Sequence, residues 1–215
     1  MFAIAADWVS AIGSFAAVVA ALYIAVRSQR RTRVSLEFEP RRGDLTLLEF
    51  KIGGDLIREV WLRIRLRNRG RSLADAAQIF LTVVRSNGKD DTRSSKWLKV
   101  SGLPLSRAPI PPGADRYFDV GFMWSGSDGG PAMAMLRVGE TSGDWEQEKK
   151  SAQDHDTLAP GVLHEIFVLG TCSNSGAQYG YLRLMFGVDK GVDTSAISCQ
   201  FERLTRRGYL RMISG

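Results

Sequence analysis

Apolar and polar residues alternate through much of the chain after residue 33, and this period of two restricts the fold more than any other feature. In VSLEFE (34–39), Val34, Leu36 and Phe38 would share one face of a strand. EVWLRIRLRN (59–68) alternates in the same way, while QIFLTVV (78–84) is continuously apolar and precedes an Asn-Gly dipeptide typical of hairpin turns. These patterns predict β-strands, several with one face buried.

The alternation continues to the end of the chain, with glycine and proline between the runs. About ten short strands without intervening amphipathic helices are typical of a sandwich or barrel rather than of a parallel α/β sheet. One helix is predicted at 142–153, inside a polar stretch at 139–161 that we interpret as an insertion. We therefore expect a mainly β fold, an elaborated antiparallel β-sandwich forming one domain at 34–215. The further strand candidates are 45–52, 96–100, 116–123, 134–138, 164–170, 181–187 and 198–204.

Two segments resemble a known class of module. LRIRLRNRGRSLADAAQIFLTVV (62–84) is similar to the immunoglobulin-like adhesion-type modules of bacteria, in which a strand ends at Asn-x-Gly and a short turn leads to the next strand. IPPGADRYFDVGF (110–122) resembles a later part of such modules, where Pro-Gly precedes a strand. The resemblance implies an immunoglobulin-like sandwich used for binding, and it carries no catalytic residues.

The amino terminus has a different composition. Trp8–Val26 contains no charged residue, and as a helix it would extend roughly 28 Å, close to the ~30 Å hydrocarbon core of a bilayer. We therefore expect residues 1–33 to form a transmembrane anchor. A buried helix of a soluble fold and a cleaved signal peptide are the alternatives, and the acidic Asp7 before the apolar run disfavours the signal peptide.

The flanks of the apolar run predict its orientation. Four arginines follow it, and no basic side chain precedes it, so the positive-inside rule places the amino terminus outside and residues 27–215 in the cytoplasm, at the inner membrane of a bacterium. The same arginines would contact anionic headgroups of the lipid bilayer. This basic cluster consists of Arg27, Arg30, Arg31 and Arg33.

Small residues recur within the same run. Gly13, Ala17 and Ala21 lie four residues apart, a spacing that lets helices approach closely in lipid and predicts self-association into a homo-oligomer. The alternative is that alanine is simply common in such helices.

The sequence contains no P-loop, no dinucleotide-binding glycine motif and no Cys-x-x-Cys, so we expect neither a cofactor nor an enzymatic activity. His155 lies between two aspartates in the polar stretch, where a solvated loop is favoured over a metal site. A nucleophilic pair of Cys172 with a histidine would require His155 or His164 within hydrogen-bond reach. Cys172 and Cys199 are too few to form a disulfide framework.

The most basic strand raises the question of function. In 59–68 the apolar register places Arg63, Arg65 and Arg67 on the opposite, exposed face beside Trp61, a basic strip able to contact phosphates. The alternative is a polar strand face answered by carboxylates of a neighbouring strand, with Glu37, Glu39 and Glu49 as the candidates.

The net charge of +6 favours anionic partners in general. The leading hypothesis is a membrane-anchored, non-enzymatic interaction protein that presents its sandwich to a protein partner or an anionic ligand. The second is a membrane-acting effector, for example in antiviral defence, whose sandwich senses a nucleotide or nucleic acid and whose spans cluster. A second basic surface is predicted near the carboxyl terminus, at Arg203, Arg206, Arg207 and Arg211.

Overall fold

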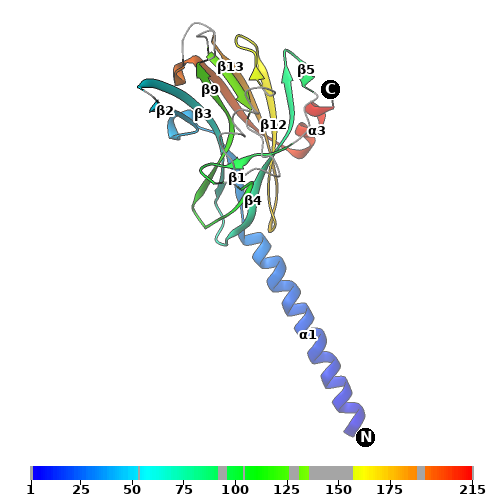
Figure 1. The fold of residues 1–215 in the computed structure, drawn as a ribbon. Helices are drawn as coiled ribbons and strands as arrows, with labels where there is room; N and C mark the ends of the chain where they lie inside the picture. The colour runs from blue at the N-terminus through cyan, green and yellow to red at the C-terminus, as the bar shows by residue number, and fades with distance from the viewer. Residues whose placement is uncertain are drawn as a thin grey trace.

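Two antiparallel β-sheets packed face to face form the body of the protein (Figure 1). The computed structural model describes residues 2–52, 54–91, 96–103, 105–125, 131–135, 157–187 and 192–214. The expectation of a mainly β, two-sheet antiparallel sandwich is confirmed, and this architecture is compatible with an immunoglobulin-like fold.

The first sheet follows the order β1-β3-β9-β10-β11, with β2 paired to β3 and β7 paired to β9. Its strands are β1 (Val34–Glu37), β2 (Leu45–Ile52), β3 (Asp55–Asn68), β7 (Lys99–Val100), β9 (Asp115–Ser125), β10 (Pro131–Met135) and β11 (Thr157–Leu158).

The second sheet follows the order β14-β13-β12-β4-β5, with β6 and β8 also paired to β4. Its strands are β4 (Ala74–Ser86), β5 (Lys89–Asp91), β6 (Lys96–Trp97), β8 (Arg107–Ile110), β12 (His164–Cys172), β13 (Ser175–Phe186) and β14 (Ile197–Leu204).

The core lies between the sheets and is built by the alternation seen in the sequence. Ile64 and Leu66 of β3 are fully buried there, as are Leu182 and Leu184 of β13. At Gly170 of β12 the sheets approach so closely that a Cβ atom would lie 2.9 Å from a side-chain methyl of Leu66. A glycine at this position therefore permits the approach.

The Asn-x-Gly turn after β3 has a structural role. Asn68 is fully buried, and its amide nitrogen donates to the carbonyl oxygens of Ser72 (2.7 Å) and Ile110 (2.9 Å). Its side-chain oxygen accepts from the backbone N–H of Gly70. A single side chain thus ties β3 to its own turn and to β8, as expected for a buried amide whose hydrogen bonds are satisfied.

The chain after β14 forms a short helix that the sequence pattern did not predict. α3 (Arg206–Ile213) begins at Thr205, whose hydroxyl accepts from the N–H of Gly208, a typical N-cap. Tyr209 buries its ring beside Phe167 and Tyr179 on the outer face of the second sheet. Arg206, Arg207 and Arg211 therefore belong to a helix outside the sandwich core.

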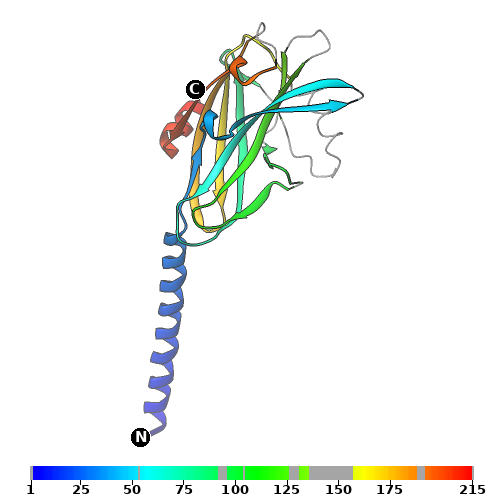
Figure 2. The ribbon, with the colours of Figure 1, turned by 90° about the vertical axis from the view of Figure 1, so that its left-hand side faces the viewer.

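The amino-terminal helix α1 (Phe2–Arg31) leads away from the sandwich as a single rod (Figures 1 and 2). Within the described residues, no helix combines the length and the apolar character needed to cross a membrane. The side chains of α1 from residue 12 to residue 27 are exposed. The predicted transmembrane segment Trp8–Val26, and with it the membrane-spanning part of the fold class, was wrong.

Most of the predicted insertion lies outside the described residues. Residues 136–156 are not described, and they include the helix predicted at 142–153 as well as His155. The short strand β11 follows directly and pairs with β10 at the edge of the first sheet.

Candidate functional site

Both faces of β3 are covered between Trp61 and Arg65, which the sequence pattern did not indicate. Trp61 is only 5% exposed and stacks on Phe122 of β9 with ring centroids 5.5 Å apart. Beside it, the Nε of Arg63 lies 3.1 Å from the Asp119 carboxylate directly across on β9, and its guanidinium is 5.7 Å from the centroid of the Trp61 ring. Trp61 and Arg63 of the predicted strip therefore pack against side chains of β9.

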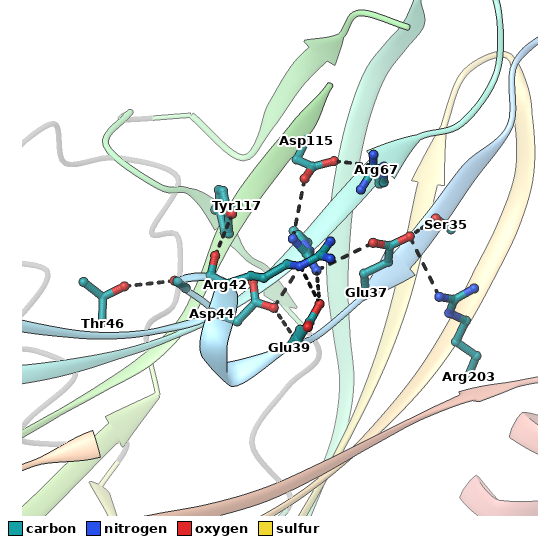
Figure 3. Close-up of polar contacts among 12 residues, drawn as sticks. Ser35, Glu37, Glu39, Arg42, Asp44, Thr46, Arg67, Asp115, Tyr117 and Arg203 are labelled. Carbon is teal, nitrogen blue, oxygen red and sulfur yellow. Dashed lines mark hydrogen bonds and ion pairs between the residues drawn. The ribbon is translucent and has the colours of Figure 1, made fainter. Parts of the chain in front are cut away.

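Arg65 is the most deeply buried of the strip arginines, with a side chain only 3% exposed. Four carboxylates surround its guanidinium at 3.5–3.8 Å (Figure 3). They come from β1, from the 3₁₀ segment η1 (Pro40–Arg42) and the residues that flank it, and from the start of β9. These carboxylates are Glu37, Glu39, Asp44 and Asp115.

The chain after β1 explains this burial. Pro40 fixes the first turn of η1, Gly43 adopts the left-handed conformation, and the segment folds back over the face of β3. Tyr117 of β9 holds the turn by donating to the carbonyl oxygen of Arg42 at 3.1 Å. The expectation that Arg65 lies exposed was wrong, because a turn distant from β3 in sequence covers it.

Several polar atoms of the buried cluster around Arg65 lack a hydrogen-bond partner. Among the described residues, Oδ1 of Asp44, Nε of Arg65 and Oδ1 of Asp115 are buried without a hydrogen-bond partner. Burial raises the pKa of Asp44 to about 6, although the N–H of Glu39 and the charge of Arg65 act in the opposite direction. Burial opposes the charge of Arg65 as well, but the carboxylates of Asp44 and Asp115 outweigh it, so the pKa of Arg65 is raised.

Glu37 joins this buried cluster to the surface. It lies opposite Arg65 in the β1–β3 register and accepts from the Ser35 hydroxyl at 2.8 Å. Its carboxylate also accepts from Nε of Arg69 at 2.9 Å, and it lies 3.8 Å from Nη2 of Arg203 on β14. Burial would raise the pKa of Glu37, but the hydrogen bonds from Ser35 and Arg69 and the nearby arginine charges hold it below its usual value.

An open pocket of about 510 Å³ lies above this carboxylate, between β1 and η1 of the first sheet and β14 of the second. Five arginines and three glutamates contribute to its lining, together with two phenylalanines whose ring centroids are 6.3 Å apart. We name it the arginine pocket. It is lined by Glu37, Phe38, Glu39, Arg42, Arg65, Arg67, Arg69, Phe201, Glu202 and Arg203.

The predicted strip is thus divided between two environments. Arg65 and Arg67 line the arginine pocket, whereas Trp61 and Arg63 do not. Glu37 and Glu39 lie beside Arg65, as the carboxylate alternative required, and Glu49 instead pairs with Arg58 at 2.8 Å.

The sequence reading did not assign Phe38, Arg42, Arg69, Phe201 or Arg203 to a common site. Arg203 was singled out only as part of a basic carboxyl terminus. Phe201 and Arg203 lie in β14, Phe38 directly follows β1, and Arg42 and Arg69 lie in η1 and in the turn after β3. Only the packing of the two sheets brings these segments together.

The catalytic candidates that can be placed do not form a pair. Cys172 and His164 occupy opposite ends of β12, eight residues or roughly 26 Å apart at the rise of an extended strand. His164 is buried, with Nδ1 at 2.8 Å from the Ser86 hydroxyl and Nε2 at 2.8 Å from the Ala159 carbonyl. Burial raises the pKa of Cys172, which disfavours the thiolate.

The remaining sequence-predicted residues lie on or just after α1. Gly13, Ala17 and Ala21 are exposed, as are Arg27 and Arg33, while Arg30 and Arg31 occupy the last turn of the same helix. Arg27 donates to the Tyr23 hydroxyl at 3.1 Å. Helix self-association and contact of the basic cluster with lipid stay predictions.

Comparison of the chain with family models, with curated proteins and with solved structures gave no match. The site therefore has to be interpreted from its own geometry.

Proposed function

We propose that this protein is a non-enzymatic binding module whose sandwich takes an anionic group of its ligand into the arginine pocket. The observation that carries the proposal is the convergence of five arginines from three separate segments on one open pocket. Arginine suits this task because its planar fork of N–H donors matches the geometry of carboxylate and phosphate groups.

Two of the arginines keep donors available to a ligand. The side chains of Arg69 and Arg203 are 49% and 53% exposed. Arg69 directs Nε and Nη2 at Glu37, and Arg203 approaches the same carboxylate through Nη2 alone. A guanidinium carries five N–H donors, so the remaining ones on each side chain can bind an anion in the pocket.

The other lining residues fit binding better than catalysis. A general acid at neutral pH needs a carboxyl with a raised pKa, whereas the hydrogen bond from Ser35 and the neighbouring arginines hold the pKa of Glu37 below its usual value. Phe38 and Phe201 add apolar surface beside the charges, which suits a ligand with both an anionic and an apolar part. Use of the sandwich for binding also agrees with what the resemblance to adhesion-type modules implies.

The proposal is tested by isothermal titration of the full chain with pyrophosphate, ATP and a short single-stranded oligonucleotide at low salt. Arg203→Ala should weaken binding of at least one probe about ten- to a hundredfold, the loss of one or two charge-assisted hydrogen bonds. Arg207→Ala removes the same charge from exposed α3, outside the pocket, and should change the affinity little. Equal losses in the two variants, or no binding of any probe, would refute an anion site in the pocket.

A further inference from the structure

The strand β14 forms one end of the second sheet. It pairs with β13 along its whole length, and no other strand among the described residues pairs with its second edge. An edge of this kind carries backbone N–H and C=O groups that can accept an added strand.

The side chains of β14 alternate between two surroundings. Cys199 and Phe201 pack against the core between the sheets, and Arg203, on the same face, approaches Glu37 of β1. Leu204, on the other face, packs against the aromatic cluster beneath α3. The face that carries Phe201 and Arg203 is therefore the one that borders the arginine pocket.

We propose that the partner is an extended acidic segment of a protein, which adds as a further strand to the free edge of β14. The part of this inference that concerns the acidic residue of the partner rests on the proposed function. The backbone pairing with β14 does not depend on it. One acidic side chain of the added strand would lie beside Arg203 and Arg69. A residue two positions away would share its face and place an apolar side chain beside Phe201.

The charges around the arginine pocket favour an acidic segment. Arg203 and Arg69 approach the pocket from the two sheets, and both pair with the carboxylate of Glu37. An added acidic residue would meet two half-exposed guanidiniums that already converge, so little further ordering of the arginines is needed.

Among the described strands, β14 is the edge that combines length with this chemistry. It contains eight residues and no proline, whereas the edge strands β1, β5 and β11 contain only four, three and two. β2 is as long as β14, but none of its residues lines the arginine pocket.

The probe is an acetylated, amidated peptide of sequence Thr-Val-Thr-Glu-Thr-Val-Thr. The sequence is the same in both directions, so it presents valine and glutamate on one face in either strand orientation. Two control peptides change one feature each: lysine replaces the glutamate, or every interior amide nitrogen is methylated to remove the backbone donors. Affinity for the full chain is measured by titration, and backbone amide exchange of β14 is followed by NMR.

The proposal expects the glutamate peptide to bind and to slow exchange of the outward amides of β14. Each control peptide should bind at least about tenfold more weakly, as should the glutamate peptide with Arg203→Ala, while Arg207→Ala should leave its affinity unchanged. Binding without protection of β14, or equal binding of the methylated peptide, overturns strand addition.

Equal binding of the lysine peptide overturns the acidic recognition. If pyrophosphate or the oligonucleotide binds through Arg203 and the peptide does not, the inference fails while the proposed anion site stands. If neither the anions nor the peptide binds, both fail.

Discussion

Replacement of Arg65 by methionine tests the buried charge cluster most directly. The substitution keeps an unbranched side chain but removes the guanidinium, and it leaves Glu37, Asp44 and Asp115 without their shared cation. Removing one partner of a buried ion pair costs about 3–5 kcal/mol, because the remaining charge stays in a poorly solvated environment. For a chain of this size that corresponds to a decrease of roughly 6–20 °C in the melting temperature.

Arg58→Met provides a matched control on the same strand. Arg58 also pairs with a carboxylate across a strand, Glu49 at 2.8 Å, but the two side chains are 54% and 45% exposed. An exposed pair contributes about 0–1 kcal/mol, so this variant should be nearly as stable as the wild type.

The assay is urea unfolding followed by tryptophan fluorescence at pH 8 and pH 5. At pH 5 most Asp44 side chains of the folded protein are protonated, since the pKa is about 6. Loss of Arg65 then leaves one buried negative charge fewer without its cation than at pH 8. The destabilisation by Arg65→Met should therefore be larger at pH 8. Equal effects of the two variants, or a larger effect at pH 5, would contradict the buried cluster.

Three further predictions follow from the same packing. Asp44→Asn should change the pH dependence of stability between pH 4 and 6, because the raised pKa lets the folded state bind a proton more tightly and the contribution of Asp44 falls by about 2 kcal/mol as pH rises through this range; an unchanged slope in pH-dependent urea unfolding would count against it. Asn68→Ala should lower the free energy of unfolding by about 2–4 kcal/mol, because it leaves buried backbone groups of β3, its turn and β8 unpaired; a loss below 1 kcal/mol would show that water replaces the amide. Gly170→Ala should cost about 1–3 kcal/mol, since its Cβ would meet two fully buried leucines; wild-type stability in a thermal melt would mean that the sheets separate easily at this point.

The predicted strands were located where the side-chain period was clear, as at β1 and β3, and where a short apolar run stood out, as at β4 and β12. Alternation can be recognised in a short stretch of sequence, and it predicts a strand because one face of each strand is buried in the core. The prediction was wrong for α1, where the uncharged run at Trp8–Val26 was taken as a membrane span. It also missed α3, whose cap and buried tyrosine depend on the outer face of a sheet formed by distant strands.

The sequence by itself determined that the chain after residue 33 forms a sandwich, and that Arg65 and Glu37 each lie on the face of their strand opposite the core residues. It could not determine that these two side chains meet. The β1–β3 register places Glu37 opposite Arg65, η1 then covers Arg65, and β14 adds Arg203 from the other sheet. These contacts join separate segments of the chain, and Glu37 and Arg203 are more than 160 residues apart in sequence. Only tertiary packing therefore decided whether an alternating arginine became a buried counter-ion or part of a pocket.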